Sequence, residues 1–266
     1  MRVLVLLPQG VYPTDMREVT IAHTGGDLYG NLTLPRHLGD LSYTAYAGRR
    51  GDSMYSGYPY LFFSWMVFFR ELGGLQYGGD LRWNTPVKGL TVKGKFINLL
   101  NPYAGLLPYE CSTKKDWTNQ FYTQFLYRRF RLDGEYRRLF DYVPYIPGAD
   151  VSTDIYAWYI AGSYRIHKRV EVGSYYSRYT DRGFAGGILA AVVPNDTDLS
   201  HPKNHVYDKV VAARVDLNRF VYLKIEGHFM DGYGMGSYPD GFYPQQKPVG
   251  SKPLTNALVV KTGFHF

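Results

Sequence analysis

The feature that most constrains the fold of this chain is a repeated alternation of apolar and polar residues. In the segment 220–229, Val221 and Leu223 point to one side of an extended chain, whereas Lys224 and Glu226 point to the other. A period of two residues is that of a β-strand with two different faces. The second face carries charges of both signs, which the core of a water-soluble protein would not accept. The pattern therefore predicts an all-β chain with an unusual charged face.

About eleven segments show this alternation, and most of them are bordered by Tyr, Phe or Trp. Residues 1–7 supply one more candidate, so we expect about 12 strands. The 26 tyrosines suit a membrane protein, because a phenol ring can place its body in lipid and its hydroxyl in water. The segments lie near residues 27–34, 41–50, 75–83, 88–98, 118–131, 134–143, 154–166, 168–178, 205–217, 220–229 and 258–266.

The connections between these segments alternate between short and long. Gly, Asn, Asp and Pro in the short ones favour hairpin turns. Short turns at one end of an antiparallel meander and long loops at the other are typical of a transmembrane β-barrel, which closes because lipid cannot satisfy a strand edge. We expect one β-barrel domain over residues 1–266; a soluble β-sandwich or β-propeller is the alternative. The short connections are 35–40, 84–86, 133–134, 166–168 and 217–218, and the long ones are 51–74, 99–117, 144–153, 179–204 and 230–254.

Composition and motif content exclude several other classes. No window has the eighteen or so apolar residues of a membrane-spanning helix, and the single cysteine, Cys111, allows no intrachain disulfide. Basic residues give a net charge of +7 but alternate with acidic ones, so no nucleic-acid partner is expected. Gly51-Asp52-Ser53-Met54 lies in a loop rather than at a strand-to-helix elbow, and the histidines lack zinc-site spacing. We therefore expect no enzymatic activity, no cofactor and no metal ion.

The charged rows identify the residues that would line the interior of a barrel. Basic residues outnumber acidic ones in these rows, which favours a water-filled pore with at most a mild preference for anions. Most of these side chains are expected only to pair with a neighbour on the next strand. The candidate pore-lining residues are Arg82, Lys93, Lys95, Arg137, Arg165, Arg169, Arg214, Lys224, Glu226 and Lys261.

One long connection contains an apolar stretch, residues 58–69, that an exposed loop would not keep as an open patch. Three placements would bury it. It could fold into the barrel as a constriction, extend a strand along the lipid face, or form a contact between subunits. The sequence does not choose between them.

The C-terminal residues resemble a known class of proteins. The segment 257–266 alternates hydrophobic residues and ends on Phe, as does the closing strand of Gram-negative outer-membrane proteins. The resemblance implies that Phe264 and Phe266 form a signal read by the barrel assembly machinery. The preceding hairpin, residues 213–232, is similar to one in bacterial porins of the phosphate-selective and DcaP-like type, in which an Arg-x-Asp turn leads into a Lys-x-Glu strand.

This resemblance implies an outer-membrane porin that lets small hydrophilic solutes or anions diffuse passively, with outer-membrane lipid as its surroundings. Porins of this type have a signal peptide and usually about sixteen strands. The chain departs on both points, so we expect a fragment of such a porin that lacks its N-terminal part. A homotrimer is compatible with the sequence but not specified by it. The alternative function is a receptor or adhesin that binds a partner through loops 179–204 and 230–254.

Overall fold

The computed structural model of the chain describes residues 3, 4, 8, 11, 24–35, 37–53, 69–106, 110–112, 115–146, 149–185, 202–232 and 254–264. Within these ranges the regular structure consists of β-strands and one short 3-10 helix, Pro202–Asn204. No helix in the same ranges has the length and the apolar character that crossing a membrane requires. The predicted all-β fold class is confirmed.

The described strands form one 13-stranded sheet. Eleven follow one another as neighbours in the order β1-β2-β3-β4-β6-β7-β8-β9-β11-β12-β13, while β5 pairs with β4 and β10 with β8. All pairings are antiparallel, which confirms the predicted meander. The strands are β1 (Thr24–Thr33), β2 (Asp40–Ser53), β3 (Phe69–Asn84), β4 (Leu90–Leu106), β5 (Glu110–Ser112), β6 (Lys115–Tyr127), β7 (Phe130–Ile146), β8 (Ala149–His167), β9 (Val170–Asp181), β10 (Phe184–Ala185), β11 (His205–Asp216), β12 (Val221–Asp231) and β13 (Leu254–Phe264).

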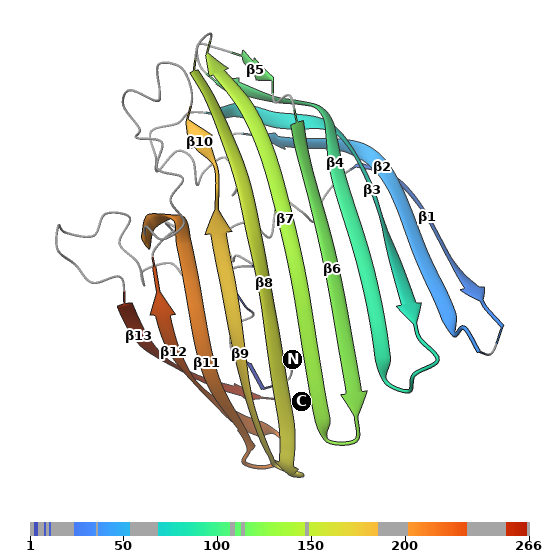
Figure 1. Ribbon diagram of the computed structural model, residues 1–266, viewed down its shortest axis with the longest axis vertical. Coiled ribbons are helices and arrows are strands. Elements are labelled where there is room, and N and C mark those ends of the chain that lie inside the picture. The colour runs from blue at the N-terminus through green and yellow to red at the C-terminus, as the bar shows by residue number, and fades with distance from the viewer. Residues whose placement is uncertain are drawn as a thin grey trace.

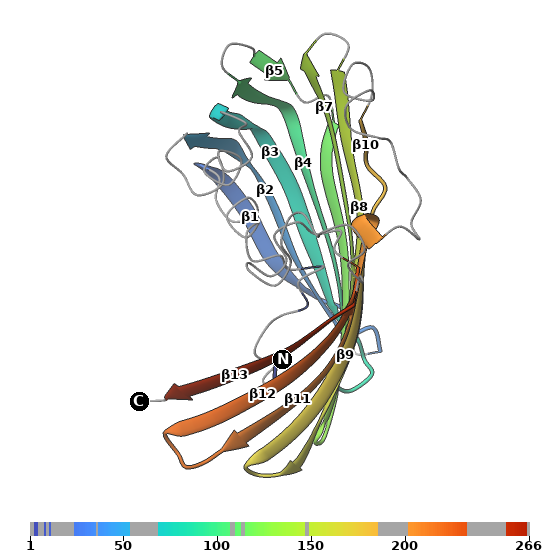
Figure 2. The ribbon, with the colours of Figure 1, turned by 90° about the vertical axis from the view of Figure 1, so that its left-hand side faces the viewer.

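The sheet curves into a trough (Figures 1 and 2), and we call its inner side the concave face and its outer side the convex face. Strands β1 and β13 are the two edges of the trough. Among the described residues, β1 pairs with β2 alone and β13 with β12 alone. The sheet therefore has the curvature of a barrel wall but is not closed.

Four of the five predicted short turns fall at hairpins between consecutive strands, with bounds that differ by one to three residues, and the fifth is wrong. Asp133 and Gly134, a sequence that usually favours a two-residue hairpin turn, lie inside β7. The turn is instead formed by Arg128 and Arg129, between β6 and β7, and Arg128 has a positive φ of 52°. Side-chain pairing explains this register, because the Asp133 carboxylate accepts hydrogen bonds from groups on β6.

Several strands are longer than predicted, at the expense of the long connections. β7 and β8 have 17 and 19 residues, so the loop predicted at 144–153 is largely strand. The loop predicted at 99–117 likewise contains the end of β4, all of β5 and the start of β6. Val3 and Leu4 do not lie in a strand, contrary to the strand predicted at 1–7. Of the apolar stretch 58–69, all but Phe69 lies outside the described residues.

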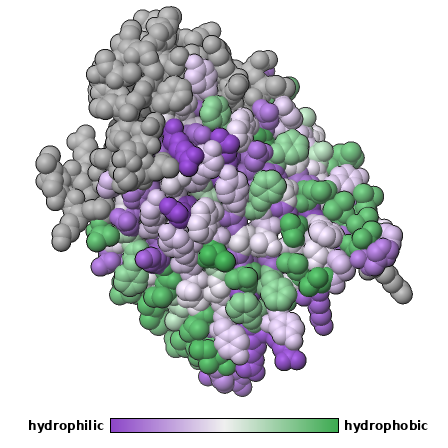
Figure 3. Space-filling view, in the orientation of Figure 1, coloured by the Kyte–Doolittle hydropathy of each residue, from purple (hydrophilic) through white to green (hydrophobic). Residues whose placement is uncertain are grey.

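The two faces of the sheet are inverted relative to a water-soluble protein. On the convex face, large apolar side chains are exposed, including Val211 at 57% and Leu258 at 72% (Figure 3). On the concave face, charged side chains are buried, including Asp208 and Glu226, both at 0%, and Asp133 at 1%. A soluble β-sandwich buries its apolar rows and hydrates its charged ones. The soluble alternative is therefore not supported by the packing.

Candidate functional site

The described residues near the N-terminus, Val3, Leu4, Pro8 and Val11, lie against the concave face, and we call them the N-terminal segment. Val3, Leu4 and Val11 are all buried and belong to an apolar cluster with residues of β8, β9, β11 and β12. Two basic side chains of the sheet hold the backbone of this segment: Lys224 Nζ donates to the Leu4 carbonyl oxygen at 2.6 Å, and Arg137 Nη1 donates to the Val11 carbonyl oxygen at 3.0 Å. Two of the predicted pore-lining cations are thus engaged with the chain itself.

A cavity of about 510 Å³ lies between this segment and the concave face of β4, β6, β7 and β8. Its size falls within the range of small-molecule pockets. The charged side chains around it are more often basic than acidic. They are Lys93, Lys95, Arg131, Arg137, Asp133 and Glu135.

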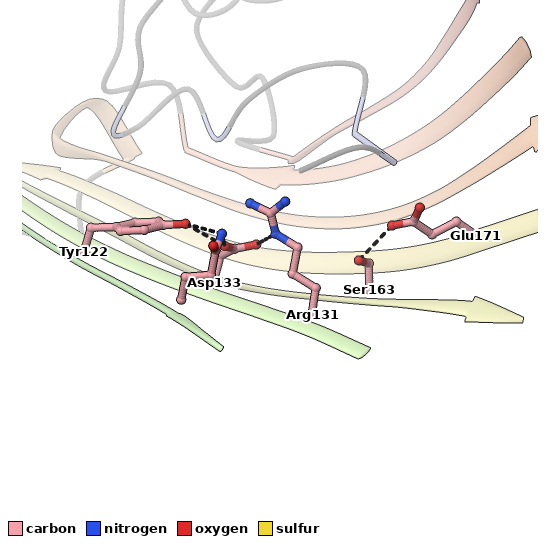
Figure 4. A network of polar contacts seen from close by, with 6 residues as sticks. Tyr122, Arg131, Asp133, Ser163 and Glu171 are labelled. Carbon is pink, nitrogen blue, oxygen red and sulfur yellow. Dashed lines mark hydrogen bonds and ion pairs between the residues drawn. The ribbon is translucent and has the colours of Figure 1, made fainter. Parts of the chain in front are cut away.

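A network of polar contacts covers the wall of this cavity (Figure 4). Asp133 accepts hydrogen bonds from Tyr122 Oη at 2.8 Å and Gln124 Nε2 at 2.8 Å, and forms an ion pair with Arg131 Nε at 2.6 Å. Gln120 on β6 likewise donates to Glu135 on β7. Because these side chains are tied to their neighbours, the charge on this part of the wall is fixed in place.

The cations on β4 are held less tightly than this network. Lys93 Nζ lies 3.5 Å from Asp80 Oδ1 and its side chain is 39% exposed. Lys95 lines the same cavity, and no carboxylate within the described ranges lies within 4 Å of its ammonium group. Positive charge is therefore available to a solute on the β4 side of the cavity.

A second cluster of charged groups is buried on the concave face of β9, β11 and β12. His228 Nδ1 lies 2.9 Å from Asp208 Oδ2, and its Nε2 lies 3.7 Å from Glu226 Oε2. Tyr175 Oη donates to the same Asp208 oxygen at 3.1 Å. All four side chains are almost completely buried, so this cluster is shielded from solutes in the lumen.

The structure separates the predicted pore-lining residues into three groups. Those on β3, β4 and β7 lie near the cavity, with Arg82 directly opposite Lys93 in the strand register. Those on β11 and β12 are buried, and Lys224 among them binds the Leu4 carbonyl oxygen. The rest lie towards the short turns or the sheet edge. The first group is Arg82, Lys93, Lys95 and Arg137, the second is Arg214, Lys224 and Glu226, and the third is Arg165, Arg169 and Lys261.

Arg165 and Arg169 lie at the β8–β9 hairpin. Arg165 forms an ion pair with Glu171 at 3.8 Å, and Arg169 lies in the turn itself rather than in a strand. Phe264, predicted as part of an assembly signal, is exposed at the end of β13. Phe266 lies outside the described residues.

Sequence reasoning did not select the residues that make up most of the cavity wall. The sequence pattern assigns Asp133 to a turn and Arg131 to the end of the preceding strand, 118–131, and Tyr122 and Gln120 carry no charge. The missed signal is the alternation itself. When it is continued from Glu135 back through Asp133 and Arg131, it places all three on the same face of one strand. Within the described ranges, no group of three or more His, Cys, Asp or Glu side chains could hold a metal ion.

An antiparallel meander with an apolar convex face and a charged concave face has the fold of an outer-membrane β-barrel wall. Among solved structures, the chain is similar to the crystal structure of the outer membrane channel DcaP of Acinetobacter baumannii, with a TM-score of 0.53 and 10% sequence identity. The similarity covers 90% of this chain and 62% of that one, so the chain spans less than two thirds of the length of DcaP.

The chain is also similar to OmpT, an outer membrane protein of Vibrio cholerae folded in vitro, with a TM-score of 0.45 and 9% identity over 92% of this chain and 77% of that one. No protein-family model and no curated protein matches the chain. At these identities the likeness to DcaP establishes the fold.

Proposed function

We propose that the chain forms the wall of a bacterial outer-membrane porin, through which small hydrophilic solutes diffuse without chemical conversion. The observation that carries this proposal is the inversion of the two faces. Exposed Leu258 and Val211 suit contact with lipid, whereas the charged concave face suits an aqueous lumen. The similarity in fold to the DcaP channel supports the same assignment.

We further propose a mild preference for anions. Lys93 and Lys95 line the cavity on the β4 side, and Arg82 lies opposite Lys93 on β3, so three cations lie close together on two neighbouring strands. The acidic groups nearest to them are engaged. Asp80 pairs with Lys93, and Glu135 accepts a hydrogen bond from Gln120. Rings and rows of charged side chains set selectivity in water-filled pores.

The test is the reversal potential of single channels in a planar bilayer under a potassium chloride gradient. For the triple variant Arg82→Glu, Lys93→Glu and Lys95→Glu, we expect the reversal potential to shift towards cation selectivity. The control makes the same change in charge at three exposed turn positions, Lys88→Glu, Lys168→Glu and Arg219→Glu.

The control should leave the reversal potential within a few millivolts of the parent, because the turn charges do not line the cavity and are screened by salt over about 10 Å at 0.1 M. Equal shifts in the two variants would contradict the assignment of the β3 and β4 cations to the lumen. Absence of discrete conductance in a correctly folded parent chain would contradict the porin proposal itself.

Phe264 supports a proposal about assembly. Its ring is 64% exposed on the convex face at the end of β13, on the free edge of the sheet. An aromatic side chain there is accessible to another protein before the edge is paired. We include the barrel assembly machinery as a partner on this ground and on the resemblance of the C-terminal segment to outer-membrane proteins.

A further inference from the structure

Arginine side chains lie on the convex face at the level where β9 ends, while β7 and β8 continue beyond it towards the long connections. Arg138 on β7 and Arg178 on β9 both follow residues that are buried on the concave face, Arg137 and Ser177, so they point the opposite way. Arg182 follows the last residue of β9. The convex face is the side that we assign to lipid, where an unpaired charge is costly within the hydrocarbon. These arginines therefore need an explanation.

Two of these arginines share one aromatic ring. The guanidinium carbons of Arg138 and Arg182 lie 4.5 and 4.7 Å from the centre of the Tyr156 ring. Asp154 makes two hydrogen bonds to Arg138, at 3.0 and 3.1 Å. The two guanidinium groups are thus within about 9 Å of each other, and Asp154 pairs with one of them.

The third arginine repeats the arrangement on the neighbouring strands. Arg178 lies 4.3 Å from the centre of the Tyr207 ring, and it is directly opposite both Trp158 and Tyr207 in the strand register. Within the described ranges, neither Arg178 nor Arg182 forms an ion pair with a carboxylate. Both cations are held in place by rings and keep hydrogen-bond donors available for an anion.

The three arginines lie at a height on the sheet that matches the boundary of the membrane hydrocarbon. Tyr156 lies about 36 Å along β8 from His167 at the short turn, at about 3.3 Å per residue. With a strand tilt of about 40° this is about 28 Å along the membrane normal, slightly more than the apolar band of about 25 Å in outer-membrane barrels. Apolar side chains such as Ile160 and Val211 are exposed between the short turns and the level of Tyr156. Figure 3 shows apolar residues across this part of the convex face.

We propose that Arg138, Arg178 and Arg182, with their aromatic partners, bind the phosphate groups of a lipid in the outer leaflet. Long loops of bacterial barrels are extracellular, so this end of the sheet meets the outer leaflet. Guanidinium groups match phosphate oxygens in bidentate geometry, and the rings supply an amphipathic surface for the sugar or glycerol part of the headgroup. The site rests on the outer-membrane placement proposed above but not on conduction.

The experiment measures the affinity of the full chain, refolded in detergent, for lipid A by isothermal titration calorimetry. The variant is Arg178→Gln with Arg182→Gln, which leaves the Arg138–Asp154 pair intact. The matched control is Arg128→Gln with Arg219→Gln, because these arginines also stack on aromatic rings but lie at the short turns. Inorganic phosphate and phosphatidylcholine are titrated separately as probes of a free anion and of a lipid without net charge.

We expect lipid A to bind the Arg178/Arg182 variant about 30-fold more weakly than the parent, from the usual contribution of two arginines at a charged membrane surface. The control should bind within about twofold of the parent. Equal affinities in the two variants would overturn the proposal, and so would inorganic phosphate or phosphatidylcholine binding as tightly as lipid A. Single-channel conductance, measured on the same proteins, separates this outcome from failure of the porin proposal, because neither variant touches the concave face.

Discussion

The buried cluster around His228 gives the sharpest prediction about stability. In the variant His228→Leu, Asp208 loses a hydrogen bond of 2.9 Å, and the two carboxylates of Asp208 and Glu226 lose the ring that lies between them. His228 and Asp208 are 2% and 1% exposed as side chains, so water cannot replace the lost contact. Removal of one partner from a buried, charged hydrogen bond costs about 3 kcal/mol. At 25 °C this is a change of about 150-fold in the folding equilibrium.

The assay is urea unfolding of the chain in detergent, followed by tryptophan fluorescence and extrapolated to zero denaturant. His37→Leu is the matched control, because His37 is exposed in the turn between β1 and β2 and should change stability by no more than about 0.5 kcal/mol. A double variant, His228→Leu with Asp208→Asn, removes the buried charge together with its partner. We expect it to be less destabilised than the sum of the two single variants by about 1.5 kcal/mol or more.

Two outcomes would refute this reasoning. If His228→Leu were no more destabilising than His37→Leu, the cluster would not contribute to stability. If the two substitutions were additive, the cost would belong to packing around each side chain and not to the hydrogen bond between them. Either result would require a different explanation for the charged groups buried on the concave face.

Two further predictions concern backbone geometry and the N-terminal segment. Gly39→Ala should destabilise the chain by about 2 kcal/mol in the same unfolding assay, because Gly39 has a φ of 79° and a Cβ there would collide with the backbone of β3. The control is Gly26→Ala, which should be nearly neutral because there is open space around Gly26. A chain carrying Val3→Cys and Gly173→Cys, with Cys111→Ser, should form an intramolecular disulfide on mild oxidation. The reason is that a Cβ at position 173 would lie 2.8 Å from Val3 Cγ1. Unchanged gel mobility after oxidation would contradict the placement of Val3 against β9.

The faces of the strands were predictable because they depend only on local alternation. Val221, Leu223 and Ile225 were assigned to one face and Lys224 and Glu226 to the other from sequence, and the structure exposes the first set more than the second. A period of two is a property of the extended backbone itself, so it survives any error in strand order or closure.

The contents of the concave face were not predictable in the same way. The hydrogen bonds from Lys224 to Leu4 and from Arg137 to Val11 join residues that are 220 and 126 positions apart. No local pattern indicates that a side chain in a barrel wall will bind the backbone of a distant segment. The prediction of a turn at Asp133 was wrong for a related reason, because contacts between β6 and β7 outweighed a strong local preference for a turn.

The direction of the two free edges has a consequence for how a complete ring can form. Eleven strands follow one another with antiparallel pairing, so the first and the last, β1 and β13, run in the same direction. Direct pairing of these edges would be parallel. Edges left unpaired in hydrocarbon would be too costly, because each exposed backbone group would cost several kcal/mol. The free energy of unfolding of a typical protein is only about 5–15 kcal/mol. A ring with antiparallel pairing throughout therefore needs an odd number of additional strands, wherever in the protein or in another chain they arise, and the resulting total is even, as it is in bacterial barrels.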